Sequence, residues 1–273
     1  MRGVTIPLVA LGLLLFSSVA STQENTAKNE LDQGVKAFRE ARFDDALTHF
    51  KLAVDSDPKL LNARMYLATT YAQQFVPGSE DAANGLLGND AIEQYKIVIE
   101  SKDPPPTQEQ QINSIKGVAS LNLQMKKFDE SRRFYKKATE LDPNDPENYY
   151  SIGVIDWTQS YQPRMEIRSK LNLKPVQSLI HNPACWQLKS QNEAVVKDGI
   201  EELTKAIKLR PDYDDAMAYL NLMFRERADI QCGDDKAYNA DTDAADKWVD
   251  MTMATKKARA EKASTPATDP RNK

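Results

Sequence analysis

The chain has 273 residues, of which 28% are charged and 41% hydrophobic, and it contains only 10 glycines. This length suits one or two ordinary domains or a single elongated one, and the composition is typical of a helical protein with many solvated faces. The net charge of −4 excludes a global basic field of the kind that holds nucleic acid.

The N-terminal segment has the layout of a secretory signal peptide. Arg2 provides a positive start, residues 4–16 are an apolar run, and residues 17–21 are mostly small. The run is too short for a typical membrane-spanning helix and contains Pro7. We expect a signal peptide over residues 1–20 and a soluble mature protein that is periplasmic or secreted. An uncleaved N-terminal anchor is the alternative.

A spacing of small and large residues recurs along the rest of the chain. In its first copy, Ala46, Phe50, Ala53 and Pro58 follow one another in steps of four, three and five. Residues three and four apart share one face of a helix, so the small ones admit a neighbouring helix and the large one fills the gap. The proline then ends the helix. The steps recur, in full or in part, in Ser131, Tyr135, Ala138 and Pro143, in Gly199, Leu203, Ala206 and Pro211, and in Ala91, Tyr95 and Val98.

A partner helix is predicted before each of these helices, because an apolar and a small residue stand together there. The clearest copies are Leu67-Ala68, Val118-Ala119 and Ile152-Gly153, with looser ones at Gln33-Gly34 and Leu220-Asn221. Helix starts agree with this scheme. Asp145-Pro146 is a cap followed by a first-turn proline, and Thr107 with Gln110 forms the pattern of a capping box.

These helix pairs resemble the tetratricopeptide repeat. Residues 42–58 and 127–143 match the second helix and the terminal proline of that repeat closely. The resemblance implies an all-α fold, a right-handed superhelical solenoid of about five helix pairs, with a concave groove lined by the first helix of each pair. The chain is then divided into a solenoid over residues 21–258 and a flexible basic tail over 259–273. The repeats lie near 27–60, 61–106, 107–145, 146–213 and 214–258.

Three insertions are predicted, each between the two helices of a pair. The small residues of the paired helices lie 12 apart in repeats one and three, but 23 apart in repeat two and 46 apart in repeat four. In repeat five they are also 23 apart if Ala244, Trp248 and Met251 belong to the second helix. Insertions at equivalent points of a solenoid map to one edge. One rim therefore carries extra structure, which is either a tolerant loop or a binding element.

The inserted segment 161–198 of repeat four has the composition of a structured element. We predict a short helix from Pro163 to Leu171. After the cap at Asn182-Pro183, one long helix is predicted from Ala184 to Leu209.

The only two cysteines, Cys185 and Cys232, lie in the insertions of repeats four and five. Neighbouring insertions on one rim lie close in space, and an oxidising compartment favours bridging. We therefore expect a disulfide between them.

The resemblance also indicates which residues face the groove and bind a partner. Tyr150 and Trp157 stand out, because aromatic residues are frequent interface anchors. Packing of these two rings against the inserted segment is the alternative. The predicted groove residues are Phe38, Arg39, Met65, Lys116, Leu123, Tyr150, Val154, Trp157 and Arg225.

No catalytic constellation is present in the sequence. There is no phosphate-binding glycine-rich loop and no nucleophile elbow, and His181 with Cys185 offers too few ligands for a metal site. We therefore predict a non-catalytic, cofactor-free scaffold that binds a protein or peptide and serves envelope assembly, transport or secretion. A self-associating structural module is the alternative. A ligand-binding protein or enzyme that uses residues 161–198 is a further one. The oligomeric state does not follow from the sequence.

Overall fold

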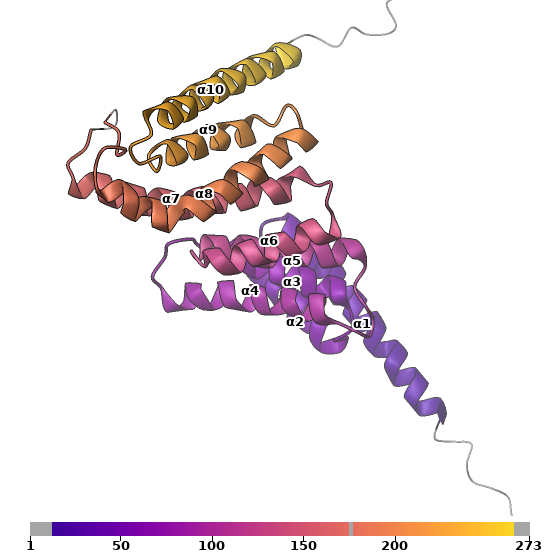
Figure 1. Ribbon diagram of the computed structural model, residues 1–273. Helices are drawn as coiled ribbons and strands as arrows, with labels where there is room; N and C mark the ends of the chain where they lie inside the picture. The colour runs from indigo at the N-terminus through magenta and orange to yellow at the C-terminus, as the bar shows by residue number, and fades with distance from the viewer. Residues whose placement is uncertain (1–12, 175–176, 265–273) are drawn as a thin grey trace, which may run out of the picture. The chain divides into compact units, whose positions relative to one another are not determined.

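The computed structural model describes residues 13–174 and 177–264. Within these residues the chain forms ten α-helices and no β-strand (Figure 1). They belong to two compact units, Met1–Lys127 and Phe128–Lys273, which we call unit 1 and unit 2. In each unit the helices pack on their neighbours in chain order, which confirms the predicted all-α fold of stacked helix pairs.

Unit 1 contains two complete helix pairs and the first helix of a third. Consecutive helices pack together, and α1, α3 and α5 also contact one another in sequence, as the first helices of successive pairs do in a repeat stack. The bounds are α1 Leu13–Arg39, α2 Phe43–Ser56, α3 Leu61–Gln74, α4 Ala82–Glu100 and α5 Gln108–Gln124.

Unit 2 contains the second helix of the third pair and two complete pairs. Each helix packs on the next, and α7 also contacts α9. The bounds are α6 Phe128–Leu141, α7 Pro146–Lys170, α8 Ala184–Leu209, α9 Asp214–Ala228 and α10 Asp235–Ser264.

Glycines at the predicted small positions set the distance between paired helices. A Cβ added at Gly34 in α1 would lie 2.4 Å from the ring of Phe50 in α2. A Cβ at Gly153 in α7 would lie 2.4 Å from Leu203 in α8. Phe50 and Leu203 are both fully buried. The small residue of one helix and the large residue of its partner therefore pack as the sequence spacing predicts.

The helix caps expected from the sequence are present. The Thr107 hydroxyl accepts a hydrogen bond from the backbone of Gln110, and the Gln110 side chain accepts one from the backbone of Thr107. Asp145 accepts a bond from the backbone of Glu147, with Pro146 at the first helical position. Such caps stabilise a helix end by about 1 kcal/mol.

The insertion of repeat two is divided between a loop and an earlier start of α4. Asp81 caps α4 through the backbone of Ala83. The buried Asn84 amide makes two hydrogen bonds with the backbone of Val76, at 2.6 and 2.9 Å. These contacts fix the loop over residues 75–81 against the helix that follows it.

The insertion of repeat four differs in one respect from its prediction. No separate helix begins at Pro163, because α7 continues through this proline to Lys170. Pro163 has no N–H to bond the carbonyl one turn earlier, which is why the sequence predicts a break there. Tertiary contacts of the following turn, described below, keep it helical. The second expected helix begins and ends where predicted, at Ala184 and Leu209.

The last helix has a different register from the predicted one. The buried positions of α10 are Asp241, Ala245 and Thr252, whereas Met251 is exposed. Ala245 therefore holds the small position assigned to Ala244. The shift follows from Asp241, a core-facing acid that accepts hydrogen bonds from Arg227 at 2.9 Å and from Gln231 at 2.6 Å.

The structure describes the predicted signal peptide and the predicted C-terminal tail only in part. Residues 259–264, assigned to the flexible tail, are the last turns of α10, where Arg259 pairs with the buried Asp214. Residues 265–273 lie outside the described residues, as do residues 1–12 of the predicted signal peptide. Over residues 13–174 and 177–264, no helix is both long and apolar enough to cross a bilayer.

Candidate partner-binding surface

Five aromatic side chains of unit 2 form a continuous surface that we call the aromatic cluster. Tyr150, Trp157 and Tyr161 are seven and four residues apart and therefore lie on one face of α7. The Tyr219 ring on α9 lies 5.7 Å from that of Tyr150 and 5.4 Å from that of Trp157. The Tyr213 ring, just before α9, lies 4.9 Å from the Tyr150 ring, and Tyr161 lies 4.9 Å from Trp157. The cluster thus joins the first helices of two successive pairs.

Four of the five rings remain partly accessible, as a binding surface requires, whereas Tyr213 is buried. Tyr150, Trp157 and Tyr219 are half-buried and Tyr161 is exposed. Large rings held by their neighbours present contact area at little further loss of side-chain entropy. The cluster can therefore accept apolar or aromatic side chains of another molecule.

A polar edge borders the cluster at Tyr213. The Tyr213 hydroxyl donates a hydrogen bond to Glu147 at 2.5 Å, and Arg210 donates to the other oxygen of Glu147 at 2.7 Å. Burial, and secondarily the bond to Glu147, raises the pKa of Tyr213. Burial also raises the pKa of Tyr150 to about 12. Both phenols are therefore neutral at physiological pH and keep their hydrogen-bonding protons.

The contacts of Tyr150 and Trp157 bear on the alternative that these rings pack against the inserted segment. Tyr150 contacts Tyr213 and Tyr219, which lie outside the inserted segment. Trp157 contacts Tyr219 and also Tyr161, the first residue of that segment. The ring–ring contacts are thus mostly with the next helix pair, but both rings also pack against the core cluster that includes Ile167, Leu179 and Leu188 of the inserted segment.

The other predicted groove residues of unit 2 occupy the same two helices. Val154 is half-buried on α7. Arg225 on α9 donates hydrogen bonds to Asn221 at 3.0 Å and to Asp246 of α10 at 2.8 Å. Arg225 is therefore already engaged within the protein.

In unit 1 the predicted groove residues lie on α1, α3 and α5. The Phe38 ring packs edge-on at 5.5 Å from Phe43 and 6.4 Å from Tyr66. Arg39 is exposed, and the remaining three are half-buried: Met65, Lys116 and Leu123. Their binding role stays a prediction.

A buried ionic network that the sequence analysis missed anchors the insertion of repeat four. The Arg164 and Arg168 guanidiniums lie 2.7 and 2.9 Å from the same carboxylate oxygen of Asp229. Arg168 also donates to the carbonyl oxygens of Lys174 and Gln177, at 2.6 and 2.8 Å. The network therefore ties the end of α7 and the loop after it to the end of α9. The four-residue spacing of the two arginines is the only sequence signal, and it does not reveal the distant acid.

Glu226 completes this network as an acid with one unpartnered oxygen. Its Oε1 lies 3.3 Å from Arg164, while the buried Oε2 has no partner. Burial raises the pKa of Glu226 to about 7, against the opposing effect of Arg164. The group is therefore partly protonated at neutral pH.

The expected disulfide between Cys185 and Cys232 is present, 47 residues apart in sequence. It joins the first turn of α8 to the loop before α10, and the backbone N–H of Gly233 donates to Ile180 at 2.8 Å beside it. The His181 ring lies 3.0 Å from Asp235, whereas the sulfur of Cys185 is bonded to that of Cys232. Within the described ranges, no group of three or more metal-ligating side chains comes together.

Comparisons with known proteins agree with this architecture. Residues 118–145, which include all of α6, match the family model described as "Tetratricopeptide repeat". This part of the chain is a tetratricopeptide repeat.

Solved structures of tetratricopeptide-repeat proteins share the fold of this chain at low sequence identity. One described as "Crystal structure of MamA protein" has a TM-score of 0.56 and 17% identity, covering 90% of this chain and 98% of the other. "MamA 41-end from Desulfovibrio magneticus RS-1" has a TM-score of 0.54 and 13% identity, covering 84% and 96%. "Crystal structure of YrrB: a TPR protein with an unusual peptide-binding site" has a TM-score of 0.52 and 10% identity, covering 89% and 97%. A search of the curated proteins found no match.

Proposed function

We propose that this tetratricopeptide-repeat protein is a non-catalytic scaffold whose aromatic cluster binds a protein or peptide partner outside the cytoplasm. The observation that carries the proposal is the contact of Tyr150 and Trp157 with Tyr219 across two successive first helices. Partly exposed aromatic rings at the centre of a surface are the usual anchors of protein interfaces. YrrB, which shares the fold, is described as having a peptide-binding site.

The proposed compartment is supported by two separate features. The N-terminal segment has the charge and apolar pattern of an export signal. The Cys185–Cys232 disulfide is of a kind that persists in oxidising compartments. Within such a compartment we propose a role in envelope assembly, transport or secretion.

Affinity capture from a cell-envelope fraction tests partner binding. The bait is the exported chain, compared with Trp157→Ala and Tyr150→Ala. Trp186→Ala is the matched control, because this tryptophan on α8 is 63% exposed and lies outside the aromatic cluster. We expect the two cluster variants, checked for native circular dichroism, to lose a partner that the wild type and the control retain. Equal capture by all four proteins would remove the cluster from partner binding.

The compartment is tested separately by a reporter fusion. Residues 1–30 are joined to an enzyme that becomes active only after export. We expect reporter activity for the natural segment and none when Leu14→Arg interrupts its apolar run. Equal activity from both fusions would contradict the signal.

Self-association is the second candidate, and it rests on the outer face of α10. Val249 and Met253 are one helical turn apart and are 38% and 64% exposed. Exposed apolar side chains on a terminal helix offer a surface on which a second copy can stack. Light scattering distinguishes the candidates, because an oligomer that grows with concentration and is lost in Met253→Glu favours self-association.

A further inference from the structure

A cavity of about 730 Å³ lies in unit 2 at the step between α6 and the longer α7–α8 hairpin. The Gln159 amide of α7 donates to Asp129 at the beginning of α6, at 3.1 Å. From this point α7 continues to Lys170, roughly three turns beyond the start of α6. The cavity is lined by this uncovered part of α7, the facing part of α8 and the first turns of α6, and we call it the step cavity.

The step cavity has an apolar floor. Ile167 of α7 is buried there, and Val195 of α8 is half-buried, beside Phe128 and Pro163. Its volume lies within the range of about 300–1,000 Å³ that ligand sites usually have. The floor can therefore receive one large apolar side chain.

The walls of the step cavity are rich in side-chain amides. Asn192 is only 3% exposed, and its Nδ2 donates to the backbone oxygen of Ser160 at 2.7 Å. That bond fixes the amide, while its Oδ1 has no partner among the described residues. Gln187 and Gln191, on the same face of α8, also have side-chain amides without a partner in the described structure. A side-chain amide both donates and accepts hydrogen bonds.

The charges of the step cavity are largely compensated within the protein. Arg132 pairs with the buried Asp156 at 2.8 Å and with Asp198 at 2.6 Å. Lys170 and Glu166 add one charge of each sign, and Asp129 adds a carboxylate that accepts a hydrogen bond from Gln159. The lining therefore favours neither a strongly anionic nor a strongly cationic ligand.

We propose that the step cavity binds an extended peptide segment of a partner, with one large apolar side chain on the floor and main-chain groups on the amides. An extended peptide has unsatisfied N–H and C=O groups that match the amides of Asn192, Gln187 and Gln191. A helical ligand satisfies its own main chain and makes no use of them. The C-terminal residues 265–273 of this chain contain no aromatic or branched aliphatic residue, so they do not supply the occupant. This site is separate from the aromatic cluster.

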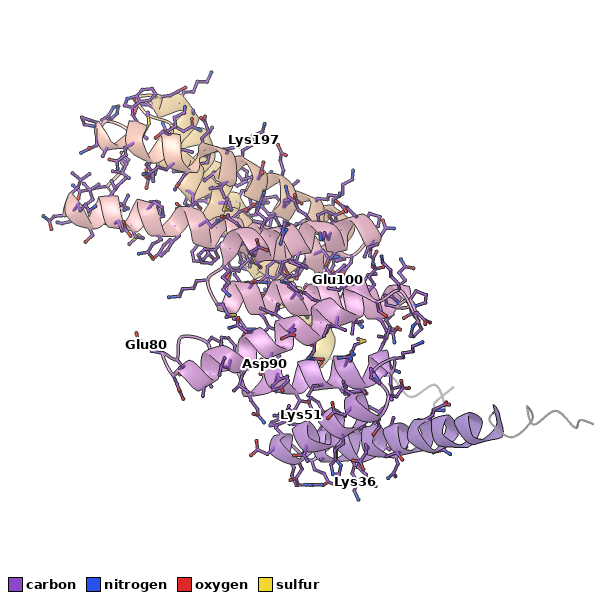
Figure 2. All side chains as sticks on the ribbon, turned by 90° about the horizontal axis from the view of Figure 1, so that it is seen from below. Lys36, Lys51, Glu80, Asp90, Glu100 and Lys197 are labelled. Carbon is purple, nitrogen blue, oxygen red and sulfur yellow. A yellow bond between two sulfur atoms is a disulfide. The ribbon has the colours of Figure 1, made fainter. Side chains whose placement is uncertain are left out.

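A linear 12-residue phage-display library, selected on the purified exported chain, tests the proposal. Selected peptides are synthesised and their Kd is measured by fluorescence polarisation. In the variant Gln191→Trp, an indole introduced at this exposed position of α8 fills part of the step cavity. The matched control is Lys197→Trp, at an exposed position of α8 that is labelled in Figure 2. Lys197 is not among the residues that line the step cavity. Trp157→Ala is included so that binding at the aromatic cluster is recognised.

We expect enriched peptides with a central apolar residue whose Kd weakens about tenfold or more in Gln191→Trp. The Kd should stay within about twofold in Lys197→Trp and Trp157→Ala. If Gln191→Trp does not fold, the double variant Gln187→Ala with Gln191→Ala removes two amides at exposed positions and should weaken binding similarly. Lack of enrichment, or binding that neither amide change affects, would overturn the proposal. Peptides lost only in Trp157→Ala would support the aromatic cluster and also overturn the step cavity.

Discussion

Replacing Gly153 by alanine tests how closely α7 and α8 must approach. The added Cβ would lie 2.4, 2.7 and 3.1 Å from Cγ, Cδ2 and Cδ1 of Leu203. Carbon atoms prefer about 3.5–4.0 Å, so the nearest atom would have to move by about 1 Å. Leu203 is fully buried within the apolar core of unit 2 and cannot move freely. Such overpacking costs about 1–3 kcal/mol.

A helix-propensity gain opposes this clash, so a double-mutant cycle is required. Alanine is favoured over glycine within a helix by about 1 kcal/mol, which leaves a net destabilisation of about 0–2 kcal/mol for Gly153→Ala. Leu203→Ala removes all three clashing atoms and alone costs about 2–5 kcal/mol. In that background Gly153→Ala should stabilise unit 2 by about 1 kcal/mol. The coupling energy of the pair is therefore about 1–3 kcal/mol.

Urea unfolding followed by tryptophan fluorescence provides the free energies. All three tryptophans lie in unit 2, at positions 157, 186 and 248, so the signal reports on that unit. Gly85→Ala in α4 measures the propensity gain alone by circular dichroism, because no atom lies within 4 Å of its added Cβ. If Gly153→Ala changes stability equally in both backgrounds, the close-approach argument is refuted.

Three further predictions concern the insertion of repeat four and its anchors. Removing the disulfide with Cys185→Ser and Cys232→Ser should lower the free energy of unfolding of unit 2 by about 4 kcal/mol in the loop-entropy account, which urea unfolding would show as a lower midpoint; an unchanged midpoint would contradict this. Arg168→Ala removes one of the two guanidiniums that contact the buried Asp229 and a donor to the carbonyls of Lys174 and Gln177, so it should cost about 1–3 kcal/mol and expose residues near 177–180 to limited proteolysis, whereas resistance equal to wild type would argue against the anchor. Because the pKa of Glu226 is raised, the folded state binds more protons than the unfolded state between about pH 4.5 and 7, so the free energy of unfolding should fall as pH rises through that window. Glu226→Gln should flatten the plot of urea midpoint against pH, and an unchanged slope would exclude this group.

Local sequence signals predicted the helices and their pairing well. The spacing of Gly34 and Phe50 indicated which residues meet, because both belong to one short pair and their faces follow from helical periodicity. The caps at Thr107 and Asp145 were predictable for the same reason. The disulfide followed from the position of both cysteines in neighbouring insertions.

Features that depend on distant partners were not predictable from those signals. The helix continues past Pro163 because Arg164 and Arg168 reach Asp229, some 60 residues later in the chain. Asp241 occupies the buried face of α10 because Arg227 pairs with it, and a hydrophobic pattern assigns an acid to solvent. The step cavity results from unequal helix lengths in neighbouring pairs, which no single repeat encodes.

The covalent link between α8 and the loop before α10 also determines how this unit responds to force. Repeat arrays contact mainly their neighbours, so a load on the C-terminus peels one pair after another. Here a load on the C-terminus can pull away α10 and the residues that follow Cys232. The 47-residue span between Cys185 and Cys232 adds no length to the extended chain while the disulfide is intact. At about 3.5 Å per residue, roughly 160 Å of contour length is withheld and becomes available only after reduction.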